Sequence, residues 1–201
     1  MSQYDVVIIG GGPAGLSTAL LLASSIPHFE EFQNKKILVI DSGRSDILRA
    51  KLLNAAGIMP GIDGQEALNL LYNQVNYFNN IKIIEGKVKS IEENKVFSIN
   101  YNSNNADYNI ESEFLVLATG FKSWNIDNLD IPFEQYQRSD KNRICISNKD
   151  YKVRKNLYVC GTLSGLSSQW NIATGSGTQV GVHILSQWAG KWKVVHDKNG
   201  K

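Results

Sequence analysis

The first forty residues of the chain alternate two apolar runs with one stretch of helical periodicity. Residues 5–9 form an apolar, mostly β-branched run of strand length. From Leu16 to Ile26 apolar side chains recur at helical spacing, and Pro27 ends that pattern. Residues 36–41 form a second run of strand length. The order of strand, helix and strand predicts a βαβ unit at the start of the chain.

The remainder of the chain contains both helical periodicity and short apolar runs of strand length. Residues 67–78 carry an amphipathic helix pattern, and residues 172–188 are expected to form a last helix. Short strands are expected at residues 81–85, 87–91, 96–101, 108–111, 114–118, 143–147 and 157–160. The connection 121–142 is polar and is predicted to be weakly structured. Residues 100–109 are rich in asparagine, which we interpret as background composition.

Six residues between the first strand and the first helix carry the strongest chemical signal. They read Gly-Gly-Gly-Pro-Ala-Gly from Gly10 to Gly15, so that Gly10, Gly12 and Gly15 form a G-x-G-x-x-G turn. Gly10 permits a tight turn off the strand, Gly12 lets a pyrophosphate approach the backbone, and Gly15 allows close packing of the helix on the strand. The helix N-terminus then offers unpaired N–H groups and a partial positive charge to phosphates.

Asp41 completes this pattern at the end of the second strand. A carboxylate at this place can accept a hydrogen bond from a ribose hydroxyl. An ordinary glycine turn is the alternative, but the strand before the turn, the helix after it and Asp41 together favour a dinucleotide site.

Composition narrows the class of protein. A chain of 201 residues forms one large domain or two small ones, and its 42% of hydrophobic residues is enough for a substantial core. Its net charge of +2 and scattered basic residues give no reason to expect a nucleic-acid surface. No apolar run is long enough to span a membrane and no signal peptide is recognised, so we expect neither membrane insertion nor secretion. Two cysteines without a C-x-x-C motif favour a reducing, cytoplasmic setting.

Three signals in order along the chain resemble one family. They are the glycine turn with Asp41, the strand 114–120 ending in Ala-Thr-Gly, and the strand 156–162 followed by a glycine-bearing helix start at 168–177. This pattern resembles the FAD domain of thioredoxin-reductase-like flavoproteins, in the pyridine nucleotide-disulfide oxidoreductase group. The Pro-Gly segment 59–64 also looks like that family's. The resemblance implies a Rossmann-like FAD-binding α/β fold, with a parallel sheet, helices on both faces, and a small antiparallel β-meander at about 86–112.

The resemblance implies FAD as the cofactor and assigns roles to particular residues. The glycine turn would hold the pyrophosphate, Asp41 the ribose, and Val88 would lie beside the adenine. The segment 118–120 would pass over the cofactor, and the start of the last helix would face the isoalloxazine edge. The complete set of implied cofactor-binding residues is Gly10, Gly12, Pro13, Ala14, Gly15, Asp41, Ser42, Asn54, Val88, Ala118, Thr119, Gly120, Gly161, Thr162, Gln169, Trp170 and Asn171.

The chain also departs from that family in three ways. Family members insert an NADPH-binding domain between the two late strands, whereas here only residues 121–142 occupy that place, without a second glycine motif. The redox C-x-x-C of the thioredoxin reductases belongs to the missing domain and is missing with it. Thr162 stands where the family has an aspartate. We therefore expect one domain over residues 1–201, with 1–120 and 143–190 forming the flavin fold.

The residues outside the cofactor site offer no convincing acid, base, nucleophile or metal cluster. Cys160 would be redox-active only with an exposed, low-pKa thiol, and a small buried residue beneath the flavin is the commoner case. Trp170 either stacks on the flavin or packs at the helix start. We thus expect no catalytic side chain and no metal.

The sequence leaves three functions open. The first is an FAD-dependent oxidoreductase whose flavin N5 exchanges a hydride or two electrons, with a partner protein or transient NAD(P)H as donor and a disulfide or small molecule as acceptor. The second is a non-catalytic flavin-binding or redox-sensing module that acts through a partner protein. The third, a Rossmann protein that holds NAD, does not need the strand 157–162 or the glycine-bearing last helix. Family members commonly form homodimers, and we expect one here.

Overall fold

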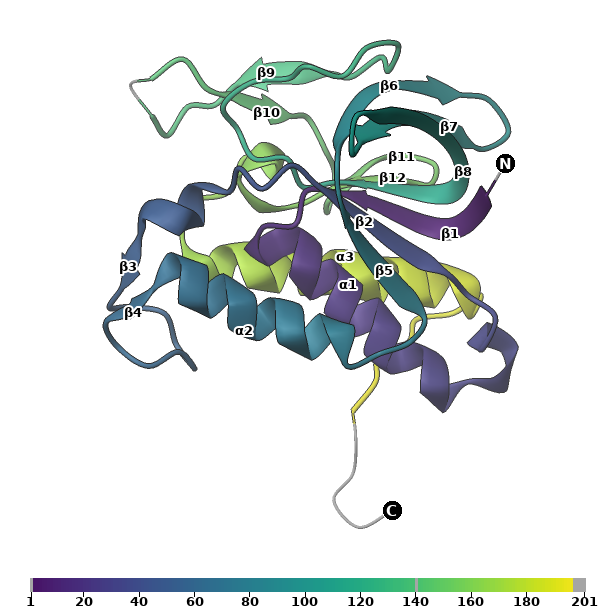
Figure 1. The fold of residues 1–201 in the computed structure, drawn as a ribbon, viewed down its shortest axis with the longest axis horizontal. Coiled ribbons are helices and arrows are strands. Elements are labelled where there is room, and N and C mark those ends of the chain that lie inside the picture. The colour runs from purple at the N-terminus through teal and green to yellow at the C-terminus, as the bar shows by residue number, and fades with distance from the viewer. Residues whose placement is uncertain (1, 140, 197–201) are drawn as a thin grey trace.

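The central sheet of the molecule is mostly parallel, as the βαβ pattern predicts. The computed structural model describes residues 2–139 and 141–196. Within this part an eight-stranded sheet has the order β11-β12-β8-β1-β2-β5, with β7 and β6 continuing from β8 (Figure 1). Its core strands are β1 (Ser2–Ile9), β2 (Ile37–Asp41), β5 (Ile81–Glu85), β8 (Ala106–Leu117), β12 (Leu157–Val159) and β11 (Lys152–Arg154). All neighbouring pairs along this row are parallel except β11 and β12.

All three long helices pack on the same face of the sheet, which differs from the expected two helical layers. They are α1 (Pro13–Ser25), α2 (Gly64–Asn76) and α3 (Trp170–Trp188), and Figure 1 shows them side by side beneath the strands. Along β1, Val6 and Ile8 pack with the helices, whereas Val7 and Ile9 pack with the antiparallel meander on the other face. Each of these four side chains is almost fully buried because both faces are covered. Within the described residues no helix is long and apolar enough to cross a bilayer.

The antiparallel meander covers the second face and is confirmed. It consists of β6 (Lys87–Glu93), β7 (Phe97–Ser103) and the first part of β8. The two strands expected at 108–111 and 114–118 are one strand, β8, which pairs with β7 and with β1. The polar residues between them suggested a break. Ser112 instead lies buried inside the strand, where its hydroxyl donates a hydrogen bond to the Phe114 carbonyl.

The connection 121–142 is more structured than its polarity indicated. It contributes β9 (Phe133–Gln135), which pairs antiparallel with β10 (Ile144–Ile146) in a small separate sheet. Leu129 and Ile131 are buried against the meander core, and the Asp127 backbone exchanges hydrogen bonds with β6. Scattered apolar residues are therefore enough to fix this segment on the sheet. Other short elements are η1 (Ile26–His28), η2 (Glu30–Phe32), η3 (Asp46–Arg49), η4 (Gly161–Ser164), β3 (Lys51–Leu52) and β4 (Ile62–Asp63).

Helices α1 and α3 meet at a crossing that only a glycine permits. A Cβ at Gly177 would lie 1.9 Å from the backbone oxygen of Ala14. The Thr18 hydroxyl donates a 2.8 Å hydrogen bond to the Gly177 carbonyl at the same crossing. This contact sets the N-terminal half of α3 against the first turn of α1, so that both helix starts lie beside the carboxyl ends of the strands.

Candidate cofactor-binding site

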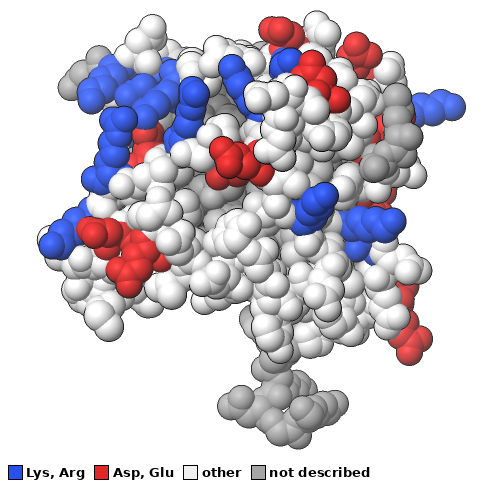
Figure 2. Space-filling view, viewed as in Figure 1, with Lys and Arg blue, Asp and Glu red and all other residues white. Residues whose placement is uncertain are grey.

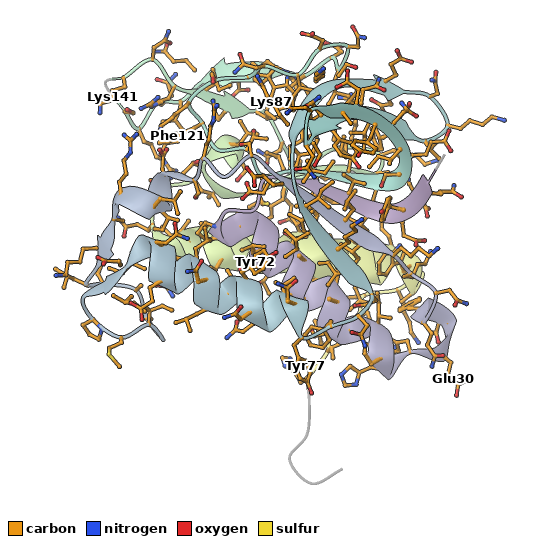
Figure 3. The ribbon with its side chains drawn as sticks, in the orientation of Figure 1. Glu30, Tyr72, Tyr77, Lys87, Phe121 and Lys141 are labelled. Atoms are coloured by element: carbon orange, nitrogen blue, oxygen red, sulfur yellow. The ribbon has the colours of Figure 1, made fainter. Side chains whose placement is uncertain are left out.

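A cavity of about 910 Å³ lies at the carboxyl ends of the parallel strands. This edge is where open α/β sheets bind their ligands, and the volume falls in the range typical of small-molecule sites. Figure 3 shows Lys87 on the meander side and Phe121 below the β9–β10 hairpin; both line the cavity. Its walls come from the segments that follow β1, β2, β5, β8 and β12, and from the start of α3.

The glycine turn after β1 exposes backbone to this cavity. Gly10 has a φ of +109°, and a Cβ there would lie 2.4 Å from the Ala118 carbonyl oxygen. A Cβ at Gly15 would lie 1.9 Å from the Gly10 oxygen, so Gly15 holds the turn tightly against α1. A Cβ at Gly12 would have one close neighbour, Ser45 Oγ at 3.2 Å. Gly10 and Gly15 are thus needed to build the turn, whereas the missing side chain of Gly12 leaves space in front of it.

The N-terminus of α1 faces the same space. Gly12 is its N-cap and provides no side-chain hydrogen bond, and no acidic residue lies in the first turn. The first N–H groups of a helix have no partner within the helix and carry the positive end of its dipole. With no acidic side chain in that turn, the position is suited to a phosphate.

Asp41 lies next to the glycine turn. Its Oδ1 accepts a 3.0 Å hydrogen bond from the Gly11 N–H, and a Cβ at Gly11 would collide with the Asp41 side chain. The carboxylate is thereby oriented, and its second oxygen is available to a hydroxyl group in the cavity.

Most residues implied by the resemblance lie together around this cavity. Fourteen of the seventeen line it, and the three that do not are Gly15, Asn54 and Asn171. Asn171 exchanges hydrogen bonds with the Ala56 backbone, and Asn54 donates to Gln169 Oε1 at 3.3 Å. These two asparagines therefore hold the loop between β3 and β4 onto the start of α3. Trp170 is 8% exposed and packs in the helical core with part of its surface on the cavity.

Several cavity residues were not anticipated from the sequence. They come from the segment after β2, from the segment after β8, and from the end of β7 with the turn that follows it: Ser45, Asp46, Ile47, Leu48, Arg49, Lys122, Ser123, Trp124, Asn125, Ile126, Asn102, Ser103, Asn104 and Asn105. Lys122 and Asp46 form an ion pair across the cavity wall. Figure 2 shows Lys and Arg side chains gathered at the upper left, where η3 and the β9–β10 hairpin lie in Figure 1. Their positive potential favours the approach of an anionic ligand.

Cys160 also lies at the cavity wall, but its thiol is fully buried. Its Sγ is 3.8 Å from the Thr18 hydroxyl, and burial raises the pKa of the thiol to about 12. The thiolate is the reactive form of cysteine, and at neutral pH it is a negligible fraction here. This environment is that of a packing residue.

We expect neither cysteine to react with a thiol reagent in the native protein at pH 8. Burial raises the pKa of the Cys145 thiol and raises that of Cys160 to about 12, which disfavours the reactive thiolate of each, and both side chains are buried from a reagent. Labelling with a chromogenic disulfide should be close to zero before unfolding and reach two thiols per chain in denaturant. Fast native labelling that a Cys160→Ser variant removes would contradict the packing role of Cys160.

Comparison with known proteins decides the family. The model of the pyridine nucleotide-disulphide oxidoreductase family matches residues 4–177. The chain belongs to this family. FAD is the cofactor of this family.

Curated relatives of this pyridine nucleotide-disulphide oxidoreductase include ferredoxin–NADP reductases. One from Oceanobacillus iheyensis is 24% identical over 73% of this chain and 45% of its own length. Another, from Lysinibacillus sphaericus, is 28% identical over 78% of this chain and 43% of its own length. The chain thus spans less than half the length of these relatives.

Solved structures share the fold of this family member. A thioredoxin reductase from Gloeobacter violaceus matches with a TM-score of 0.75 at 13% identity, over 98% of this chain and 99% of that chain. A ferredoxin-flavin thioredoxin reductase from Clostridium acetobutylicum matches with a TM-score of 0.68 at 17% identity, over 94% and 99%. The Rossmann-like flavin fold expected from the resemblance is therefore confirmed.

The residues of this site fit FAD. A diphosphate needs approachable backbone and free N–H groups, which Gly12 and the start of α1 offer. A ribose needs an oriented acceptor, which Asp41 supplies. The cavity continues from the glycine turn toward Trp170 in one direction and toward Val88 in the other, so it can hold both halves of a dinucleotide.

Proposed function

We propose that this chain is an FAD-dependent oxidoreductase whose bound flavin receives a hydride or two electrons from a donor and passes them to an acceptor. The donor is a partner protein or transiently bound NAD(P)H, and the acceptor is a disulfide or a small molecule. The observation that carries the proposal is a single cavity with the glycine turn and Asp41 toward one end and the start of α3 at the other. The spectrum and electron transfer of the purified protein test it.

The chain's own residues bind and orient the cofactor. FAD supplies two-electron and hydride chemistry when bound. The N-terminus of α1 would stabilise the negative charge of the pyrophosphate, and Asp41 would hold the adenosine ribose. Gln169 is the N-cap of α3, no acidic residue lies in that helix's first turn, and both Gln169 and Trp170 line the cavity. The positive end of α3 therefore favours negative charge at that end of the site.

The protein itself is proposed to supply no redox thiol. Cys160 is the cysteine at the cavity wall, and its buried, protonated thiol is not a nucleophile. In the described part of the chain, no group of three or more His, Cys, Asp or Glu residues is placed to hold a metal ion. We therefore propose that electrons pass from the flavin directly to an external acceptor.

The segment 121–142 is part of this proposal because it stands in place of a nucleotide-binding domain. It forms β9 and a connection that packs on the meander, and residues 121–126 line the cavity. A donor would thus reach the flavin beside this short segment, within one domain that spans the chain.

A cytoplasmic homodimer completes the proposal. Two free thiols fit a reducing compartment. Leu53 and Met59, on the loop between β3 and β4, are 71% and 78% exposed and offer apolar surface to a second copy. Light scattering on the purified chain tests the dimer separately from its chemistry.

The proposal is tested by reducing the purified protein under anaerobic conditions. We expect a yellow protein whose flavin is bleached by NADH, NADPH or a reduced ferredoxin and regains colour with a disulfide, a quinone or oxygen. Free FAD at the same concentration is the control, because the protein should accelerate at least one donor step over it. A stably bound flavin that none of these donors reduces faster than free FAD would favour the alternative, a non-catalytic flavin-binding module that acts through a partner.

A further inference from the structure

The turn between β7 and β8 reaches the cavity although it lies far from the glycine turn in sequence. We propose that the side-chain amides of Asn104 and Asn105 hydrogen-bond the adenine base of the dinucleotide and select adenine over other bases. The proposal rests on FAD as the cofactor and adds a base-reading site to it. Both asparagines line the same cavity as Gly12 and Asp41.

The order of the strand ends identifies which part of the ligand meets this turn. Asp41 pairs with Glu85 at the ends of β2 and β5, and the Gly86 N–H donates a 2.8 Å hydrogen bond to the Asp41 carbonyl. The cavity wall beyond Asp41 therefore consists of residues 85–88 and the neighbouring turn. With the pyrophosphate at the glycine turn and the ribose at Asp41, the group beyond the ribose is the base.

Side-chain hydrogen bonds and an ion pair hold the turn in place. The Ser103 hydroxyl donates a 2.6 Å hydrogen bond to the Glu85 carbonyl, which joins the turn to the end of β5. On the other side, Asn102 Nδ2 donates to Asp107 Oδ1 at 2.7 Å, and Lys89 pairs with the same carboxylate. Gly86 permits this approach, because a Cβ there would lie 3.0 Å from the Asn102 backbone oxygen. The turn is thus preorganised, and its tip need not move to meet a ligand.

The two central side chains are not used by the turn itself. Asn104 and Asn105 have φ values of +51° and +61°, typical of a two-residue hairpin turn of type I′. Both are exposed, and within the described residues neither side chain makes a hydrogen bond. An amide has a donor and an acceptor side by side, which match the N6 amino group and N7 of adenine. Hypoxanthine carries an oxygen in place of that amino group, so it presents two acceptors and loses one of the two bonds.

Asparagine also favours a type I′ turn, so the test removes the amides and keeps the turn. Glycine adopts positive φ without strain, and the N104G/N105G variant should therefore fold like the parent. The matched control is N128G, since Asn128 also has a positive φ, +63°, but does not line the cavity. Thermal melts of both variants check that the fold is retained.

The base preference is measured by displacing bound FAD with adenosine diphosphate (ADP) and with inosine diphosphate (IDP), which differ only in the base. We expect the parent chain and N128G to bind ADP about tenfold more tightly than IDP, as a bidentate contact to a base gives. In N104G/N105G that preference should vanish, and FAD affinity should fall by about the same factor. A variant that keeps the preference, or a parent that has none, overturns the base-reading role. A parent chain that binds no FAD overturns the cofactor assignment too, so the two failures are distinguishable.

Discussion

A Gly12→Val variant is expected to fold and to lose its FAD. Gly12 has a φ of −74° and a ψ of −178°, extended backbone that any residue adopts. The valine methyl groups would extend into the space in front of the N-terminus of α1, where we propose that the pyrophosphate binds. We expect affinity for FAD to fall at least about a hundredfold, or about 2.7 kcal/mol. The free energy of unfolding should fall by about 1 kcal/mol at most. This loss is expected because valine is a poorer N-cap residue than glycine.

Flavin content and apo-protein stability measure this result independently. The visible flavin band reports occupancy, and urea unfolding of the flavin-free proteins reports the fold. A Ser45→Ala variant is the control, since Ser45 Oγ is the atom nearest to the new side chain, and the control should retain flavin. If Gly12→Val purified with a full complement of FAD, the pyrophosphate could not lie at this turn.

A Gly177→Ala variant is expected to lose about 3 kcal/mol of unfolding free energy, or to fail to fold, because the added methyl group overpacks a close contact. The new Cβ would lie 1.9 Å from the Ala14 backbone oxygen, which moves only if α1 and α3 separate. Separation would also break the bond from Thr18 to the Gly177 carbonyl. A variant that does not accumulate in soluble form would agree with this expectation.

Gly175 provides the matched control in the same helix. A Cβ there meets no atom within 4 Å, so Gly175→Ala should keep or raise stability, by up to about 1 kcal/mol from helix propensity. Urea unfolding of both variants beside the parent measures the difference. Equal stability of the two variants would show that the helix crossing tolerates a methyl group and would contradict the close contact.

The local parts of the site could be predicted because their constraints are local. A tight turn, a close helix approach and a ribose acceptor require glycines and a carboxylate at fixed spacing, and Gly10, Gly12 and Asp41 all lie on the cavity wall. Most of the strand and helix positions followed in the same way from periodicity, although β8 was expected as two strands and β9 was not expected. Asn54 and Asn171 were assigned to the site only through the resemblance. In the structure they join the loop between β3 and β4 to the start of α3 and do not line the cavity.

The tertiary features could not be predicted from the same patterns. Periodicity indicates that a strand is buried on both faces but does not indicate which layer covers each face. Helices were therefore expected on both faces of the sheet, whereas the meander covers one of them. A polar Ser112 inside a strand looks like a break until its buried hydrogen bond is known. For Asn104 and Asn105, turn preference alone accounts for asparagine, and only the structure places the turn on the cavity.

Strand β8 gives the molecule a property that follows from its continuity. Asn105 directly precedes this strand and Ala118 directly follows it, and both line the same cavity. Figure 1 shows the strand curving between the meander and the sheet centre. One continuous strand therefore joins two parts of the cavity wall, and between them it runs past Ser2, at the end of β1 away from the cavity. The distance between Asn105 and Ala118 consequently depends on the curvature of this one strand, and a substitution that straightens it would move these two cavity residues apart.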